Sequence, residues 1–130
     1  MRLKCLILLR DFQLQIVFFD GVFCTGTLHL FPKEILPQVI SEINRILKPR
    51  GRIVIDSATD IKRVLPDGKL FIRKSEPQYK IKEVTKILRE LFQDYKVKIV
   101  NSEVPEEEIK TQSLVYKFSC KFILLIADKQ

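Results

Sequence analysis

The chain has 130 residues, of which 46% are apolar and 30% charged, and its 23 basic and 16 acidic residues give a net charge of +7 at neutral pH. These values exclude a disordered chain, and the length predicts a single domain with one hydrophobic core. No apolar run reaches the roughly 18 residues of a membrane span, and the apolar run after Met1 is interrupted by Lys4 and closed by Arg10, so we expect a cytoplasmic protein without a secretion signal.

The cysteines of the chain are Cys5, Cys24 and Cys120, and His29 is its one histidine. The number of cysteines is odd, and none lies within CxxC spacing of another. We therefore expect neither a disulfide scaffold nor a cysteine-based zinc site, and we predict no metal.

Two apolar segments begin the chain. Leu3 to Leu9 is so short that its periodicity does not separate a strand from a helical turn, and we favour a strand. Ile16 to Cys24 is rich in β-branched and aromatic residues and is apolar on both faces. That pattern is typical of a central parallel strand with helices on both sides.

A helix follows from Pro32, because the apolar side chains now recur at intervals of three and four residues. The positions that share this face are Leu36, Val39, Ile40, Ile43, Ile46 and Leu47. Pro49 cannot continue the helix, so we expect it to end at Leu47 or Lys48. A turn then leads into a second buried strand from Arg52 to Asp56. Strand, helix and strand in this order predict a βαβ unit with parallel strands.

The second half of the chain continues the alternation of helices and strands. We expect an irregular segment from Ser57 to Gln78, a helix from Tyr79 to Tyr95 and a strand from Val97 to Val100. A last strand runs from Ser119 to Ala127, after the acidic and polar stretch that begins at Glu106. We expect the last two strands to form an antiparallel pair.

Three short motifs between Phe19 and Asp56 occur in a set order and spacing. They are Phe19-Asp20-Gly21-Val22 in the strand, Leu28-His29-Leu30 after it, and Arg45-Ile46-Leu47-Lys48-Pro49-Arg50-Gly51 at the end of the helix. Together they resemble the later half of the class I, Rossmann-like S-adenosylmethionine-dependent methyltransferases. The remaining elements of that family match Tyr79 to Ala127.

The resemblance implies an α/β fold: one domain, residues 1–130, with part of a Rossmann-like methyltransferase sheet. Its strands would be parallel except for an antiparallel C-terminal strand, and helices would cover both faces. Arg50 stands where the family has the first glycine of its PGG turn, so we expect Gly51 to adopt the positive-φ conformation of that turn.

The glycine-rich cofactor loop of the family is missing from the chain. The four glycines of the chain are Gly21, Gly26, Gly51 and Gly68, and no two lie within four residues of each other. The chain therefore resembles a methyltransferase without its first half, truncated or split, and we expect it to be inactive without a separate cofactor-binding half.

The resemblance implies S-adenosylmethionine as cofactor and a set of residues around it. Contacts to the cofactor would come from Asp11, Cys24, Thr25 and Gly26, and contacts to the substrate from Asp56 and Ser57. Ligands of open parallel sheets bind at the carboxyl ends of the strands, which agrees with the last five positions. The alternative is structural, with Cys24 as a small buried residue and Gly26 in a turn.

His29 is a weak candidate for a catalytic base, because it follows the strand that would carry the cofactor contacts. The alternative is a role in packing or in the loop. Asp20, in the middle of the strand, is expected to be structural.

Partners are predicted from the strand Ile16 to Cys24, whose edge would be open if the first half of the sheet is missing. Leu3 to Leu9, a second copy of the chain or a separate chain could cover it. Between Ile61 and Lys98 there are eleven basic and five acidic residues, so this segment carries +6 of the net charge. An alternative function is therefore a non-catalytic, self-associating module that binds an anionic partner such as RNA.

Overall fold

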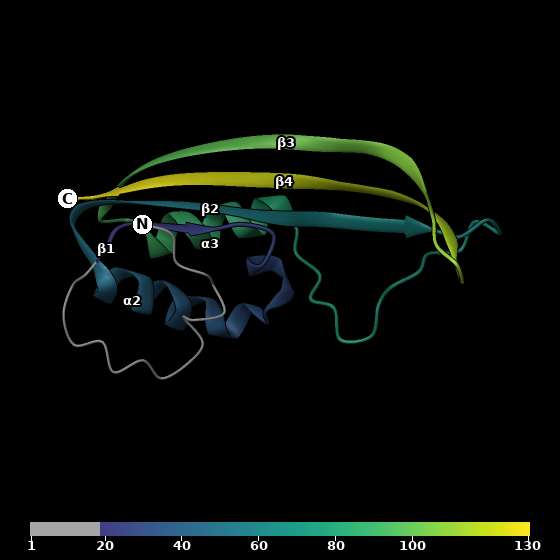
Figure 1. Ribbon diagram of the computed structural model, residues 1–130, viewed down its shortest axis with the longest axis horizontal. Helices are drawn as coiled ribbons and strands as arrows, with labels where there is room; N and C mark the ends of the chain where they lie inside the picture. The colour runs from purple at the N-terminus through teal and green to yellow at the C-terminus, as the bar shows by residue number, and fades with distance from the viewer. Residues whose placement is uncertain (1–18) are drawn as a thin grey trace.

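The computed structural model describes residues 19–130 (Figure 1). Helices separate the first three strands, and the last two strands follow each other directly. The expected strand Leu3 to Leu9 lies outside the described residues. The elements are β1 (Phe19–Cys24), the short 3-10 helices η1 (Leu28–Leu30) and η2 (Lys33–Ile35), α2 (Leu36–Ile46), β2 (Leu47–Val64), α3 (Ile81–Leu91), β3 (Tyr95–Lys110) and β4 (Val115–Lys129). No helix among the described residues is long and apolar enough to cross a membrane.

The strands form one sheet in the order β1-β2-β4-β3. β1 and β2 are parallel and are joined through α2, as the βαβ pattern predicts. β4 is antiparallel to both of its neighbours, β2 and β3. The α/β class and the antiparallel C-terminal strand are therefore confirmed.

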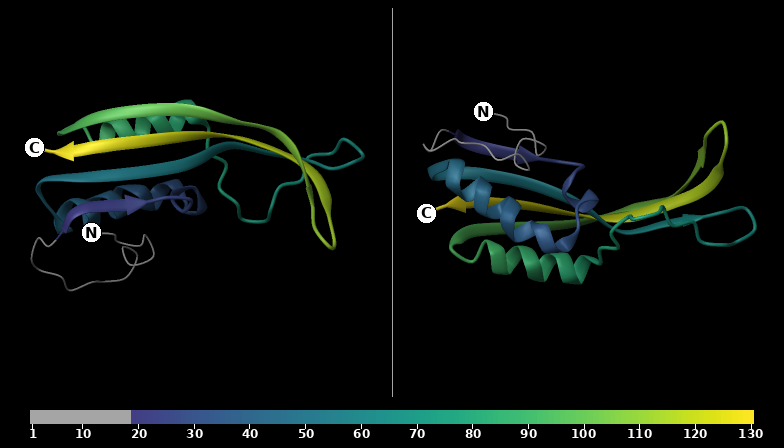
Figure 2. Two further views of the ribbon diagram at one scale, coloured as in Figure 1. Left: turned by 45° about the horizontal axis from the view of Figure 1, so that its top comes forward. Right: turned by 90° about the horizontal axis from the view of Figure 1, so that it is seen from below.

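Both described helices cover the same face of the sheet (Figure 2). The core lies between this face and the helices, and the buried residues of α2 and α3 pack in one cluster with alternate strand residues. Ile53 and Ile55 of β2, together with Ile123 and Leu125 of β4, are fully buried there. We expected helices on both faces, and for the described residues this is wrong, because the opposite face carries no helix.

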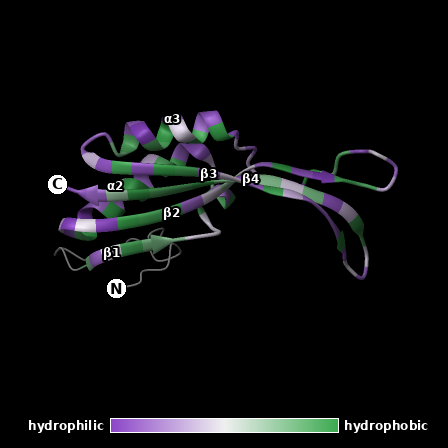
Figure 3. Cartoon of the chain, turned by 90° about the horizontal axis from the view of Figure 1, so that it is seen from above, coloured by the Kyte–Doolittle hydropathy of each residue, from purple (hydrophilic) through white to green (hydrophobic). Residues whose placement is uncertain are grey.

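The face without helices, which we call the open face, carries a row of apolar residues across its centre. Figure 3 colours the strands that contribute them by the hydropathy of each residue. Phe23, Val54 and Ile126 lie side by side across β1, β2 and β4, and Leu124 and Val100 are neighbours on β4 and β3. Phe23 is 45% exposed and Val100 43% exposed. A monomeric sheet normally buries such side chains, so this face resembles half of a core.

Beyond the core, strands β2, β3 and β4 continue as a twisted arm (Figure 1). The arm consists of residues 59–64, 103–110 and 115–121, together with the loop 65–72 that folds back on the end of β2. The expectation of an irregular segment from Ser57 is wrong, since β2 continues to Val64 and pairs with β4 over this length. Pairing is irregular between Thr59 and Lys62 of β2 and between Val104 and Glu107 of β3. An extra residue in a strand bends it and increases its twist, which accounts for the bend of the arm.

The turn between α2 and the paired part of β2 differs from the expectation. Arg50 itself has the positive φ, 67°, and Gly51 does not. Gly51 is instead required for space, because a Cβ there would lie 2.8 Å from the carbonyl oxygen of Lys48. The side chain of Lys129 closes the end of α2 by donating to the carbonyl oxygens of Asn44 and Leu47, at 2.8 and 2.7 Å.

Candidate functional site

The carboxyl ends of β1 and β2 meet at one edge of the core. β1 ends at Cys24, which pairs with Ile55, and the next residue of β2 is Asp56. The loop after β1 turns back towards β2, where the backbone amide of Gly26 donates a hydrogen bond of 2.7 Å to Oδ1 of Asp56. Gly26 has φ +63°, and nothing lies within 4 Å of the position of a Cβ there. This bridge brings two predicted site residues, from opposite ends of the βαβ unit, into contact.

The other predicted residues at this edge divide into exposed and buried ones. Thr25 is exposed. Cys24 and Ser57 are each only 1% exposed, and Cys24 packs in the core beneath the helices. Asp11 lies outside the described residues.

His29 lies in η1 beside the part of β2 that extends past the end of β1. Its Nδ1 accepts a hydrogen bond of 3.3 Å from the backbone amide of Ala58. The imidazole therefore substitutes for a strand partner that β1 is too short to provide. Burial lowers the pKa of His29 below its ordinary value of 6.5, although Asp56 and Glu76 act in the opposite direction. A neutral ring, with its proton on Nε2, fits this geometry.

We expect the pKa of His29 to make the fold less stable in acid. Below pH 6.5 the unfolded chain binds a proton at His29 more readily than the folded chain does, because the pKa of His29 is lower in the folded chain. The free energy of unfolding therefore decreases as the pH falls below this value. In His29→Asn the amide oxygen replaces Nδ1 as acceptor for Ala58 and does not titrate. The melting temperature of the wild type should therefore drop more than that of the variant between pH 7.5 and 5.5. An equal drop in the melting temperatures of wild type and variant would show that His29 does not cause the loss of stability in acid.

Asp60 and Tyr79 are site residues that the sequence did not indicate. Asp60 has a φ of 49°, and its Oδ2 accepts a hydrogen bond of 3.0 Å from the amide of Ile81 at the start of α3. Its own amide donates to the carbonyl oxygen of Tyr79 at 2.7 Å. The Tyr79 hydroxyl in turn donates to the carbonyl oxygen of Phe31, and burial raises the pKa of Tyr79 to about 12. These contacts tie the loop before α3 to the residues after η1.

S-adenosylmethionine would find one side of a site at this edge. The open space beside Gly26 would admit part of the cofactor. The exposed Thr25 and the half-buried Asp56 would contact the cofactor on this side. The described residues do not enclose a ligand there, and the Gly26 amide is already engaged by Asp56. The residues present therefore fit part of the cofactor and not the whole of it. The described residues also contain no group of three or more His, Cys, Asp or Glu side chains placed to hold a metal ion.

Comparison with known proteins finds one family model that matches part of the chain. Residues 9–55 match the methyltransferase domain family. TehB from Haemophilus influenzae is similar over 88% of the chain, with 18% identity and a TM-score of 0.55, and the chain spans 37% of TehB. YcgJ from Bacillus subtilis is similar over 92% of the chain, with 12% identity and a TM-score of 0.59, and the chain spans 68% of YcgJ.

A third similar structure is a SAM-dependent methyltransferase from Archaeoglobus fulgidus. It is similar over 88% of the chain, with 18% identity and a TM-score of 0.54, and the chain spans 61% of it. No curated protein sequence matches the chain. At these identities the solved structures show a shared fold. The fold and the family match confirm the resemblance to class I methyltransferases that the three motifs indicated.

Proposed function

We propose that the chain is part of an S-adenosylmethionine-dependent methyltransferase and that the ends of β1 and β2 form one side of its cofactor site. The contact between the Gly26 amide and Asp56 carries this proposal. It lies at the carboxyl edge of two parallel strands, where ligands of open α/β sheets bind. The family match reaches Ile55, the residue directly before Asp56.

The rest of the cofactor site would come from a further polypeptide segment, either a separate chain or another part of a longer protein. The chain spans only 37% of TehB, and the described residues lack a glycine-rich loop. The apolar open face around Phe23 and Val100 supports a covering segment of this kind, because both side chains are more than 40% exposed. The described chain alone is then expected to bind the cofactor weakly and to transfer no methyl group. A cytoplasmic location remains a prediction.

A second candidate function is binding of an anionic partner such as RNA without catalysis. The segment from Ile61 to Lys98 carries +6 of the net charge. On α3, Lys82, Lys86 and Arg89 are all exposed. Basic residues are also common on the solvent-exposed faces of ordinary helices. The charge of α3 therefore supports RNA binding less strongly than the strand edge supports the methyltransferase function.

Backbone amide shifts in NMR distinguish the two functions, since they detect weak binding and locate it. Millimolar S-adenosylhomocysteine is expected to shift the amides of Thr25, Gly26 and Asp56. Asp56→Ala removes the acceptor of the Gly26 amide and should weaken these shifts. The matched control is Asp20→Ala, an exposed carboxylate in β1 whose contact is with Lys48 at 3.5 Å.

Two outcomes would contradict the methyltransferase proposal. One is no shift at the strand edge at millimolar ligand. The other is equal shifts in wild type and Asp56→Ala. A short RNA that shifts the amides of Lys82, Lys86 and Arg89, while the cofactor shifts none, would favour the second candidate.

A further inference from the structure

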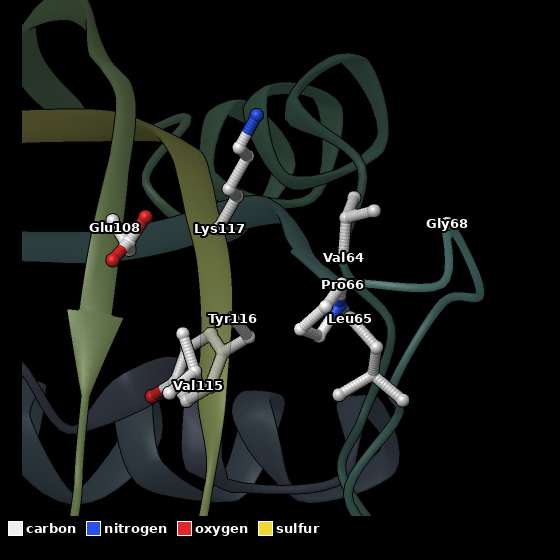
Figure 4. Close-up of a pocket in the computed structure, with 8 residues that line it drawn as sticks. All are labelled: Val64, Leu65, Pro66, Gly68, Glu108, Val115, Tyr116 and Lys117. Atoms are coloured by element: carbon white, nitrogen blue, oxygen red, sulfur yellow. The ribbon is translucent and has the colours of Figure 1, made fainter.

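The arm carries a pocket that belongs to neither the strand edge nor the core (Figure 4). Its volume is about 290 Å³, and its apolar walls are formed by Val64, Leu65 and Pro66 from the end of β2 and by Tyr116 of β4. Glu108 and Lys117 line the same pocket. They are direct neighbours across β3 and β4, so the pocket presents one negative and one positive group side by side.

Two large apolar side chains lie exposed beside this pocket. Leu70 and Ile72 are each 61% exposed, more than any other large apolar side chain in the described residues. Leu70 forms an antiparallel bridge with Val64, which lines the pocket. Bridge partners place their side chains on the same face, so Leu70 lies on the face of the arm that carries Val64 and its other ladder partner, Lys117. The arm therefore has an apolar projection and an apolar pocket next to each other.

We propose that the pocket is filled by the Leu70 region of a second copy of this chain, so that two arms pair about a two-fold axis. A two-fold interface requires a surface that is complementary to itself. Here the projection of each copy meets the pocket of the other. The charges are self-complementary in the same way, because Lys117 of each copy faces Glu108 of its partner. This inference does not depend on the proposed function.

The charged groups are available for such pairing. Within the chain, Lys117 lies 3.9 Å from Glu106, and Glu108 lies 3.2 Å from Lys110. All four side chains are at least 50% exposed. Exposed ion pairs of this kind contribute little and exchange readily. Burial at a dimer interface would strengthen the new pairs by excluding water.

Sedimentation equilibrium of the purified chain tests the dimer. The wild type is expected to dimerise, and Leu70→Lys should raise the dissociation constant about 100-fold, since two buried leucines are lost per dimer. The matched control is Leu30→Lys, because Leu30 is 56% exposed and lies in η1 rather than on the arm. Equal melting temperatures of the variants show that the fold is intact.

A mixing experiment tests the two-fold geometry. Lys117→Glu places two acidic pairs across the interface, and Glu108→Lys places two basic pairs there, so each variant alone should be monomeric. In an equimolar mixture every cross-interface pair again has opposite charges, and a heterodimer should form. A monomeric wild type overturns the proposal. So does a dimer that Leu70→Lys leaves intact, or a mixture of the charge variants that stays monomeric.

Discussion

Replacement of Gly51 by alanine should lower the free energy of unfolding by about 3 kcal/mol, the upper end of the usual cost of overpacking a core. A Cβ at Gly51 would lie 2.5 Å from Cδ1 of Leu47 and 2.8 Å from the carbonyl oxygen of Lys48. Leu47, the first residue of β2, is fully buried, so its side chain has no free space to move into. The backbone oxygen cannot move without disturbing the end of α2. Urea unfolding of wild type and variant measures the loss.

Arg50→Gly is the matched control for this turn. Arg50 is exposed and has a φ of 67°, a conformation that costs an L-residue roughly 1 kcal/mol. Glycine removes this cost, so the variant should be as stable as the wild type or slightly more so. If Gly51→Ala unfolds like the wild type, or if Arg50→Gly is the more damaging change, the assignment of roles in this turn is wrong.

The same turn illustrates what the sequence could and could not predict. The helix α2 was predictable because its buried positions recur at three and four residues, and Pro49 stops it close to the observed end. The glycine role was assigned by likeness to a PGG turn. That likeness does not reveal which residue lacks room for a side chain, because Leu47 and Lys48 create the restriction only once the turn is folded.

The extension of β3 into the arm escaped prediction because it has no hydrophobic period. β3 was expected only from Val97 to Val100, where it packs on the core, and it continues to Lys110 through Glu106, Glu107 and Glu108, all exposed. No residue of β3 from 101 to 110 is buried, so this part of the strand has no alternation to detect. Pro105 also argued against a strand, but it lies within the irregular pairing between Val104 and Glu107, where a proline is tolerated.

The candidate site was partly predictable for a topological reason. Residues that follow parallel strands gather at one edge, so Gly26 and Asp56 could be placed near each other before any contact was known. The contact of His29 with Ala58 depends on how many residues β2 continues beyond the end of β1, and the sequence does not indicate that length.

The arm also contains the most deeply buried ion pair of the described chain. Arg63 donates to Glu76 at 2.9 Å, and their side chains are 7% and 11% exposed. The guanidinium lies 5.8 Å from the ring centre of Phe118, and its buried Nε has no hydrogen-bond partner. The pair fastens the loop before α3 to the arm. Because both charges are removed from water, each is stabilised mainly by the other.

Loss of either partner is therefore expected to destabilise the fold by about 3 to 5 kcal/mol, because the remaining charge stays buried and unpaired. Arg63→Met and Glu76→Leu test the two halves by urea unfolding at one protein concentration. Glu103→Gln is the control, since Glu103 is 76% exposed and 4.0 Å from Lys121. It should change stability by less than about 0.5 kcal/mol.

The double variant Arg63→Met with Glu76→Leu separates a dependent pair from two independent contacts. With both charges gone, no buried charge lacks a partner, and apolar side chains fill similar volumes. The double variant should then lie within about 2 kcal/mol of the wild type, far above the sum of the single losses. Additive losses would show that Arg63 and Glu76 stabilise the arm separately. In that case Arg63 would stabilise the arm through its contact with the ring of Phe118 on β4, independently of Glu76.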